Sequence, residues 1–148
     1  MPQLISTQRS ARFTWSELTA VYLGRGYVLA GEFEKAKQTL EEILELQKQY
    51  GMKFVIGSAY RLLGEIALQC NTVEASSNFE KSINILTEIK AENELALAHT
   101  GYGKLYIQQG NIEKARKYLN QALETFERLG TLIEPDKLRK ELAELPAS

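Results

Sequence analysis

An internal repeat with a period of 39–40 residues limits, more than any other feature, how this sequence can fold. The segment LGRGYVLAGEFEKAKQTL (residues 23–40) returns 79 positions later as YGKLYIQQGNIEKARKYL (residues 102–119). A weaker copy, LGEIALQCNTVEASSNF (residues 63–79), lies between them. The residues of the first segment that are identical in the last are Gly24, Tyr27, Gly31, Glu34, Lys35, Ala36 and Leu40. Three copies at this period predict a stack of similar supersecondary units.

Each copy has the pattern of two antiparallel helices. Apolar residues recur at steps of three and four, as at Ala36, Leu40 and Ile43, which is typical of an amphipathic helix. Prolines occur only at positions 2, 135 and 146, so the interval between the first two is open to helix formation. We expect first helices over residues 14–30, 52–70 and 92–109, and second helices over residues 32–50, 73–89 and 112–129.

Residues that favour the left-handed conformation separate the expected helices. Gly31 and Gly110 lie between the two helices of the first and third pairs, and Asn71 holds this place in the middle pair. Gly51 and Gly130 follow the second helices of the first and third pairs. Asn111 is suited to cap the helix that follows it.

Another set of glycines, Gly24, Gly64 and Gly103, recurs inside the first helices. A phosphate-binding loop would need G-x-G-x-x-G directly after a strand, or Gly-Lys-Ser/Thr, and neither pattern is present. We therefore interpret these glycines as sites where the two helices of a pair approach closely.

The segment after Gly130, TLIEPDKLRKELAELPAS, predicts a capping helix. Leu138, Leu142 and Leu145 form an apolar stripe with charged residues opposite, which suits a helix that closes the end of a repeat stack. The expected organisation is a lead-in over residues 1–13, repeats over residues 14–130 (14–51, 52–90 and 91–130), and a capping helix and tail over residues 131–148.

The residues in equivalent places of the copies carry a family resemblance. They read Leu23-Gly24-Tyr27-Gly31-Ala36-Leu40-Ile43, then Leu63-Gly64-Ala67-Asn71-Ala75-Phe79-Ser82, then Tyr102-Gly103-Tyr106-Gly110-Ala115-Leu119-Ala122. This pattern resembles the tetratricopeptide repeat. The resemblance implies an all-α fold, a right-handed α-solenoid of three helix-turn-helix repeats plus a C-terminal capping helix. It also implies a concave face that binds a protein or peptide.

The resemblance assigns the concave face to four places in each first helix. These places hold Val21, Arg25, Val28 and Leu29 in the first copy; Arg61, Glu65, Leu68 and Gln69 in the second; and Thr100, Lys104, Ile107 and Gln108 in the third. Aliphatic contacts would supply affinity, and Arg25, Arg61 and Lys104 would fix the register of the partner. These residues do not match the carboxylate clamp of chaperone-binding relatives.

Little in the sequence indicates chemistry. His99 is the only histidine and Cys70 the only cysteine, so neither a catalytic set nor a metal site can be assembled, and no enzyme activity or cofactor is expected. We interpret His99 as a core or half-buried residue, and Cys70 as a small buried apolar one. The net charge of −1 and the lack of a long apolar stretch or leader favour a cytoplasmic protein without nucleic-acid or membrane partners.

The sequence thus favours a scaffold that binds a protein or peptide. The closing segment is similar to the ends of long-period repeat arrays in large bacterial regulators, and we expect the chain to be a sensing or assembly arm of this kind. One alternative is a homo-oligomerisation module, because Phe13 and Trp15 precede the first repeat. Single-stranded RNA binding is the least favoured alternative, since that function needs a basic groove.

Overall fold

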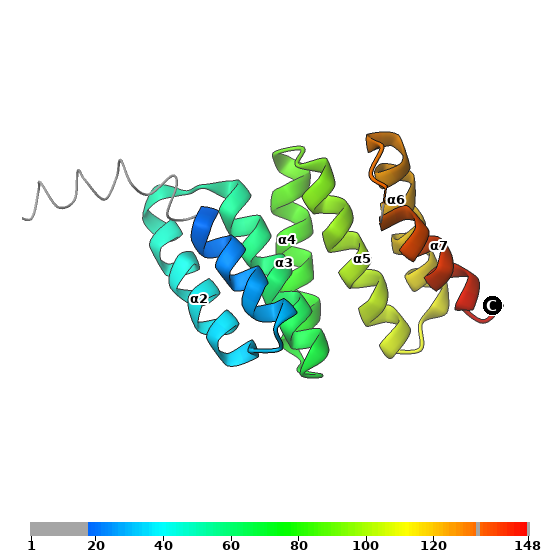
Figure 1. The fold of residues 1–148 in the computed structure, drawn as a ribbon, viewed down its shortest axis with the longest axis horizontal. Coiled ribbons are helices and arrows are strands. Elements are labelled where there is room, and N and C mark those ends of the chain that lie inside the picture. The colour runs from blue at the N-terminus through cyan, green and yellow to red at the C-terminus, as the bar shows by residue number, and fades with distance from the viewer. Residues whose placement is uncertain (1–17, 133, 148) are drawn as a thin grey trace, which may run out of the picture.

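A computed structural model describes residues 18–132 and 134–147, and helices make up most of this part of the chain. The first helix covers residues 18–29 of the described chain. It is followed by α2 (Phe33–Tyr50), α3 (Lys53–Gln69), α4 (Glu74–Glu88), α5 (Glu92–Gln108), α6 (Ile112–Leu129) and α7 (Glu134–Glu144). Successive helices lie side by side along the long axis of the molecule, with no strand among the described residues (Figure 1). The predicted all-α solenoid is confirmed.

The expected helix boundaries agree with the structure to within one residue wherever both ends are described. The predicted start of the first helix at residue 14 and the lead-in over residues 1–13 lie outside the described residues. The C-terminal end of the first helix falls at residue 29, one residue before the expected end.

The turns between helices use left-handed residues, as the sequence predicts. Gly31, Asn71 and Gly110 have φ angles of 76°, 55° and 77°. Gly51 and Gly130 end α2 and α6 in the same conformation. The side chain of Asn111 accepts a hydrogen bond from the backbone N–H of Lys114 at 3.2 Å, so the predicted cap is confirmed.

One left-handed residue was not predicted. Lys90 follows α4 with a φ of 56°, in the place that a glycine takes after α2 and α6. The Ala91 N–H still bonds the Leu86 carbonyl at 3.0 Å, so the helix ends in the same way although the residue is unfavourable there.

The recurring glycines inside the first helices are packing sites, which confirms their interpretation. A Cβ built on Gly24 would lie 2.8 Å from Leu40, and one on Gly103 would lie 2.8 Å from Leu119. A Cβ built on Gly64 would lie 2.8 Å from the ring of Phe79. In each pair, the missing Cβ lets a large side chain of the second helix fill the space against the first.

The repeats stack through apolar residues that are continuous from one pair to the next. Leu62, Leu63 and Ile66 of α3 pack with Leu40 and Ile43 of α2. The next cluster joins α3, α4 and α5, and a third joins α5, α6 and α7. The core is therefore a series of interfaces between neighbouring helices, as expected for a repeat protein.

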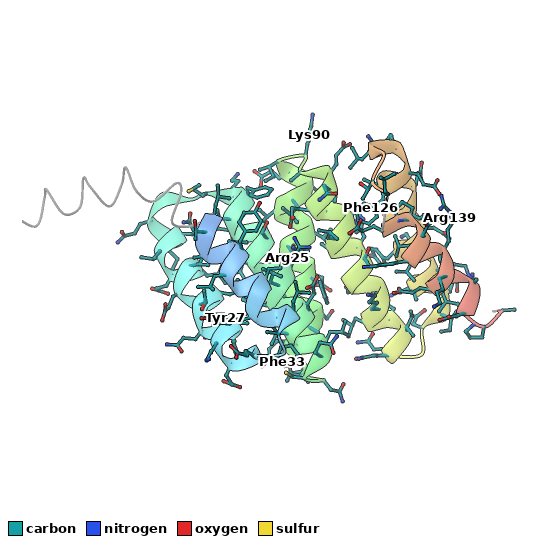
Figure 2. The ribbon with its side chains drawn as sticks, in the orientation of Figure 1. Arg25, Tyr27, Phe33, Lys90, Phe126 and Arg139 are labelled. Carbon is teal, nitrogen blue, oxygen red and sulfur yellow. The ribbon has the colours of Figure 1, made fainter. Side chains whose placement is uncertain are left out.

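The helix α7 covers the C-terminal end of this stack (Figure 1). Leu138 is buried, and Leu142 and Leu145 pack partly buried against the cluster that includes Phe126 of α6. Arg139 (labelled in Figure 2) ties α7 to α6 through an ion pair with Glu127 at 2.6 Å. The apolar stripe predicted for the capping helix does face the repeats.

Candidate functional site

A groove of about 530 Å³ runs along the first helices of the successive pairs. Its apolar lining includes Val28, Leu29 and Leu68, and its polar lining includes Glu65 and Lys104. Further lining residues come from the first turn, from α2 and α3, and from α5, α6 and α7: Gly31, Phe33, Gln69, Leu97, Thr100, Gly101, Phe126, Glu134, Lys137, Leu138 and Glu141. Apolar surface with a few charged groups around it is the usual composition of a binding site.

Seven of the twelve residues assigned to the concave face from the sequence line this groove. They are Val28, Leu29, Glu65, Leu68, Gln69, Thr100 and Lys104. They come from the first helix, α3 and α5, which the stacking places side by side. Leu29 is the most open of the aliphatic ones, with 79% of its surface exposed.

Arg61 is buried in the protein and belongs to an internal charge cluster. Its Nε donates to Glu94 at 3.0 Å, and its Nη1 donates to Glu65 at 2.7 Å. Ser58 Oγ also donates to Glu94, at 3.2 Å. Burial by itself would lower the pKa of Arg61, but the two carboxylates outweigh it and raise the pKa above its ordinary value. The guanidinium is thus charged and held by ion pairs with Glu65 of α3 and Glu94 of α5. We therefore leave Arg61 out of the proposed surface.

The other four assigned residues do not line the groove either. Val21 is buried in the first core cluster, and Ile107 is partly buried against the third. Gln108 donates from Nε2 to the carbonyl of Leu68 at 3.3 Å, which links α5 to α3. Arg25 is exposed on the first helix and is not among the residues that line the groove.

The sequence did not assign any groove residue to α7. Glu134, Lys137, Leu138 and Glu141 lie on one face of α7 and line the C-terminal part of the groove. Lys104 of α5 forms an ion pair with Glu141 at 3.4 Å. The spacing of these residues shows that they share a helix face, but only the packing of α7 shows that this face turns toward α5.

The comparison with protein families now decides the identity of the repeat. Residues 55–128, half of the chain, match the family model of the tetratricopeptide repeat. The chain belongs to the tetratricopeptide repeat family. Tetratricopeptide repeats generally mediate protein–protein interactions and are typically scaffolds without catalytic activity. No curated protein matches the chain.

The family match covers α3 to α6, that is, the second and third copies of the tetratricopeptide pattern. The first copy, outside the match, has the same glycine–leucine packing at Gly24 and Leu40 and the same left-handed turn at Gly31. The groove draws on all three copies and on α7.

The two residues considered for chemistry in this tetratricopeptide protein have different surroundings. His99 is half-buried with its ring centroid 5.7 Å from that of Tyr118, and burial lowers its pKa. This confirms the half-buried interpretation. The interpretation of Cys70 is wrong: Cys70 is exposed, because it is the C-cap residue just past the last turn of α3.

The described residues were also searched for groups of metal ligands and for helices that could span a membrane. Within residues 18–132 and 134–147, no group of three or more His, Cys, Asp or Glu side chains could hold a metal ion. In the same part of the chain, no helix is both long and apolar enough to cross a bilayer.

Proposed function

We propose that this chain binds a segment of a partner protein in the groove between its first helix, α3, α5 and α7. The observation that carries the proposal is the exposure of Leu29 beside Val28 and Leu68, at the edge of a cavity of about 530 Å³. An apolar side chain of the partner would bury against these aliphatic groups. Burial of apolar surface is the main source of affinity in such contacts.

The charged groups around the groove give the partner its register. Glu65 and Lys104 stand on neighbouring helices of the lining, and Glu134 and Lys137 continue the mixture of charges on α7. The partner segment is therefore expected to be an extended or helical peptide with apolar anchors and charges of both signs.

The experiment is the selection of peptides from a displayed random library on the purified chain, followed by titration of one selected peptide. Leu29→Asp should weaken its binding by about tenfold or more, because a carboxylate would replace the exposed apolar contact that the proposal rests on. Val73→Asp is the matched control, since Val73 is 93% exposed and lies in the turn between α3 and α4, outside the groove. Equal binding by the two variants would contradict a site in the groove.

We also propose that the chain serves as a sensing or assembly arm of a larger bacterial regulator and works in the cytoplasm without enzyme activity. The similarity of its closing segment to long-period arrays of such regulators supports this role. A nucleic-acid partner is not favoured, because the net charge is −1 and the groove lining carries both signs of charge. Titration with single-stranded RNA at low salt should show no binding. Binding that weakens as salt is added would support a nucleic-acid partner instead.

A further inference from the structure

A second cavity, of about 270 Å³, lies between α2, α3 and α4. It shares Phe33 with the groove and none of the other residues that line the groove. The buried side chains of Leu63, Ile66 and Ala67 line it on α3. The remaining lining residues are Glu34, Lys37, Glu41, Cys70, Thr72, Glu74 and Asn78. The cavity is therefore separate from the site proposed above.

The cavity lies at the end of the helices where the first helix turns into α2. Phe33 is the first residue of α2, and Cys70 follows the last turn of α3. The described chain begins at residue 18, at the other end of the first helix, which is roughly 18 Å long. The lining of the cavity thus comes wholly from described residues of α2, α3, α4 and the turn between α3 and α4.

The next interface along the stack, between α4, α5 and α6, holds tyrosine rings at the equivalent place. The repeat pattern aligns the cavity residues Leu63 with Tyr102, Ala67 with Tyr106, and Asn78 with Tyr118. The three rings contact one another, with centroids 4.8, 4.9 and 5.7 Å apart. The first interface has smaller side chains at these places, and there the cavity is open.

The polar end of the tyrosine cluster also has a counterpart at the cavity. The Tyr102 hydroxyl donates to Glu80 at 2.8 Å, and burial raises the pKa of Tyr102, so the hydroxyl keeps its proton. Glu80 aligns with Glu41, which lines the cavity. Within residues 18–132 and 134–147, Glu41 has no hydrogen-bond or ion-pair partner. The cavity therefore has the acceptor of this hydrogen bond but not the donor.

The charge around the cavity indicates what should flank a bound ring. Its charged groups are the carboxylates of Glu34, Glu41 and Glu74 and the ammonium group of Lys37, so negative charge exceeds positive. In the next interface, the place of Glu74 is taken by Lys114, whose Nζ lies 5.3 Å from the centroid of the Tyr106 ring. A cation beside a ring in the cavity would therefore be supplied by the partner, and the carboxylates would attract it.

We propose that the cavity binds a tyrosine side chain of a partner protein, with a lysine or arginine next to that tyrosine. The phenol ring lies over Ala67, in the place that Tyr106 takes in the next interface. Its hydroxyl donates to Glu41, as Tyr102 donates to Glu80. The flanking cation lies among the carboxylates and pairs with Glu74. Phosphorylation of the tyrosine prevents binding, because it brings a second group of negative charges to the same place.

The test is a titration of the isotope-labelled full chain with the peptide acetyl-Gly-Lys-Tyr-Lys-Gly-amide, followed by NMR. The amide signals of Ala67, Cys70 and Asn78 should shift with a dissociation constant on the order of millimolar, since one side chain anchors the peptide. Phenylalanine in place of the tyrosine should weaken binding at least about threefold, because the hydrogen bond to a charged acceptor is lost. The phosphotyrosine peptide should cause no shift at these residues.

Variants of the chain test the two contacts separately. Glu41→Lys should weaken binding at least about tenfold, because it replaces the acceptor by a cation. Glu42→Lys is the matched control, since the neighbouring Glu42 is also exposed on α2 but does not line the cavity. Ala67→Tyr introduces the residue of the next copy and should abolish binding by filling the cavity, with circular dichroism as the check that this variant is folded.

Several results would overturn the proposal. They are the absence of shifts at the cavity up to about 10 mM peptide, equal binding of the phenylalanine peptide, tighter binding of a peptide with arginine in place of the tyrosine, and unchanged binding by Glu41→Lys. A peptide selected for the groove should bind the Glu41→Lys chain as tightly as the unmodified chain. The two sites are therefore tested independently.

Discussion

Replacement of Gly64 by alanine tests how the helix pairs are packed. The new Cβ would lie 2.8, 2.9 and 3.0 Å from Cε1, Cδ1 and Cγ of Phe79, which is fully buried in α4. The same ring also abuts Gly101 of α5, where a Cβ would clash with Cε1 and Cζ. The ring is rigid and held by two helices at once. It cannot move away from α3 without a rearrangement that also involves α5.

Two opposing contributions set how much Gly64→Ala changes the free energy of unfolding. Alanine is favoured over glycine inside a helix by about 1 kcal/mol. Overpacking of a filled core costs about 1–3 kcal/mol, and the upper end applies here because an aromatic ring has no rotamer that relieves the clash. The free energy of unfolding should therefore fall by about 2 kcal/mol. Gly103→Ala should cost less, since Leu119 is not a rigid ring, but the new Cβ would still lie 2.8 Å from Cδ2 and Cγ of Leu119 and 3.3 Å from the Ala115 carbonyl oxygen.

The assay is urea denaturation followed by far-UV circular dichroism, with a check that the dependence on urea is unchanged. Gly26→Ala is the matched control: its Cβ meets nothing, so it should raise the free energy of unfolding by up to about 1 kcal/mol. The cost of Gly64→Ala should shrink in a Phe79→Leu background, because the leucine side chain is smaller than the phenyl ring and can change its rotamer. If Gly64→Ala stabilised the chain as much as Gly26→Ala does, the packing argument would be refuted.

Three further changes test other parts of the structure. Lys90→Gly should stabilise the chain by about 1 kcal/mol in urea denaturation, because it removes the strain of a left-handed lysine, whereas Lys90→Ala should bring no gain. Arg61→Met should lower the free energy of unfolding by about 3–5 kcal/mol, since it leaves two carboxylates without their buried partner, and an effect below about 1 kcal/mol would contradict the charge cluster. Burial lowers the pKa of His99 below 6.5, so the folded chain binds a proton less readily than the unfolded one, and stability should fall as the pH drops through 6.5. His99→Gln should flatten this part of the pH profile of stability, and an unchanged profile would assign the effect to another group.

The fold was predictable from the sequence because residues with the same structural role recur at a fixed spacing along the chain. Gly24 and Gly103 reveal close helix pairs, and Gly31 and Gly110 reveal turns, since these conformations and contacts favour glycine over other residues. The left-handed conformation of Lys90 could not be predicted, because lysine does not favour it. Its left-handed conformation is imposed by the end of α4 and the start of α5, and nothing in the residue type signals it.

The groove was predictable only in part, because its composition depends on contacts between repeats. The family resemblance assigns Arg61 to the concave face, but the burial of Arg61 depends on Glu94, which lies on α5 and 33 residues later. The contribution of α7 depends in the same way on how the capping helix docks. Register along one helix can be inferred from periodicity, whereas the choice of ion-pair partners requires the packed structure.

The ion pairs and positions of the basic residues indicate which contacts should govern recognition in the groove. Of the three expected to fix a partner, Arg61 is held by Glu65 and Glu94, and Lys104 is paired with Glu141. Arg25 is exposed but does not line the cavity. Apolar contacts at Leu29 should then supply most of the affinity, and exposed charges little. A rise in salt from about 0.05 M to about 0.5 M, which shortens the screening length severalfold, should change the dissociation constant of a selected peptide less than about threefold. A tenfold loss of affinity over that range would mean that charge pairs govern recognition and that the ion pair of Lys104 opens for the partner.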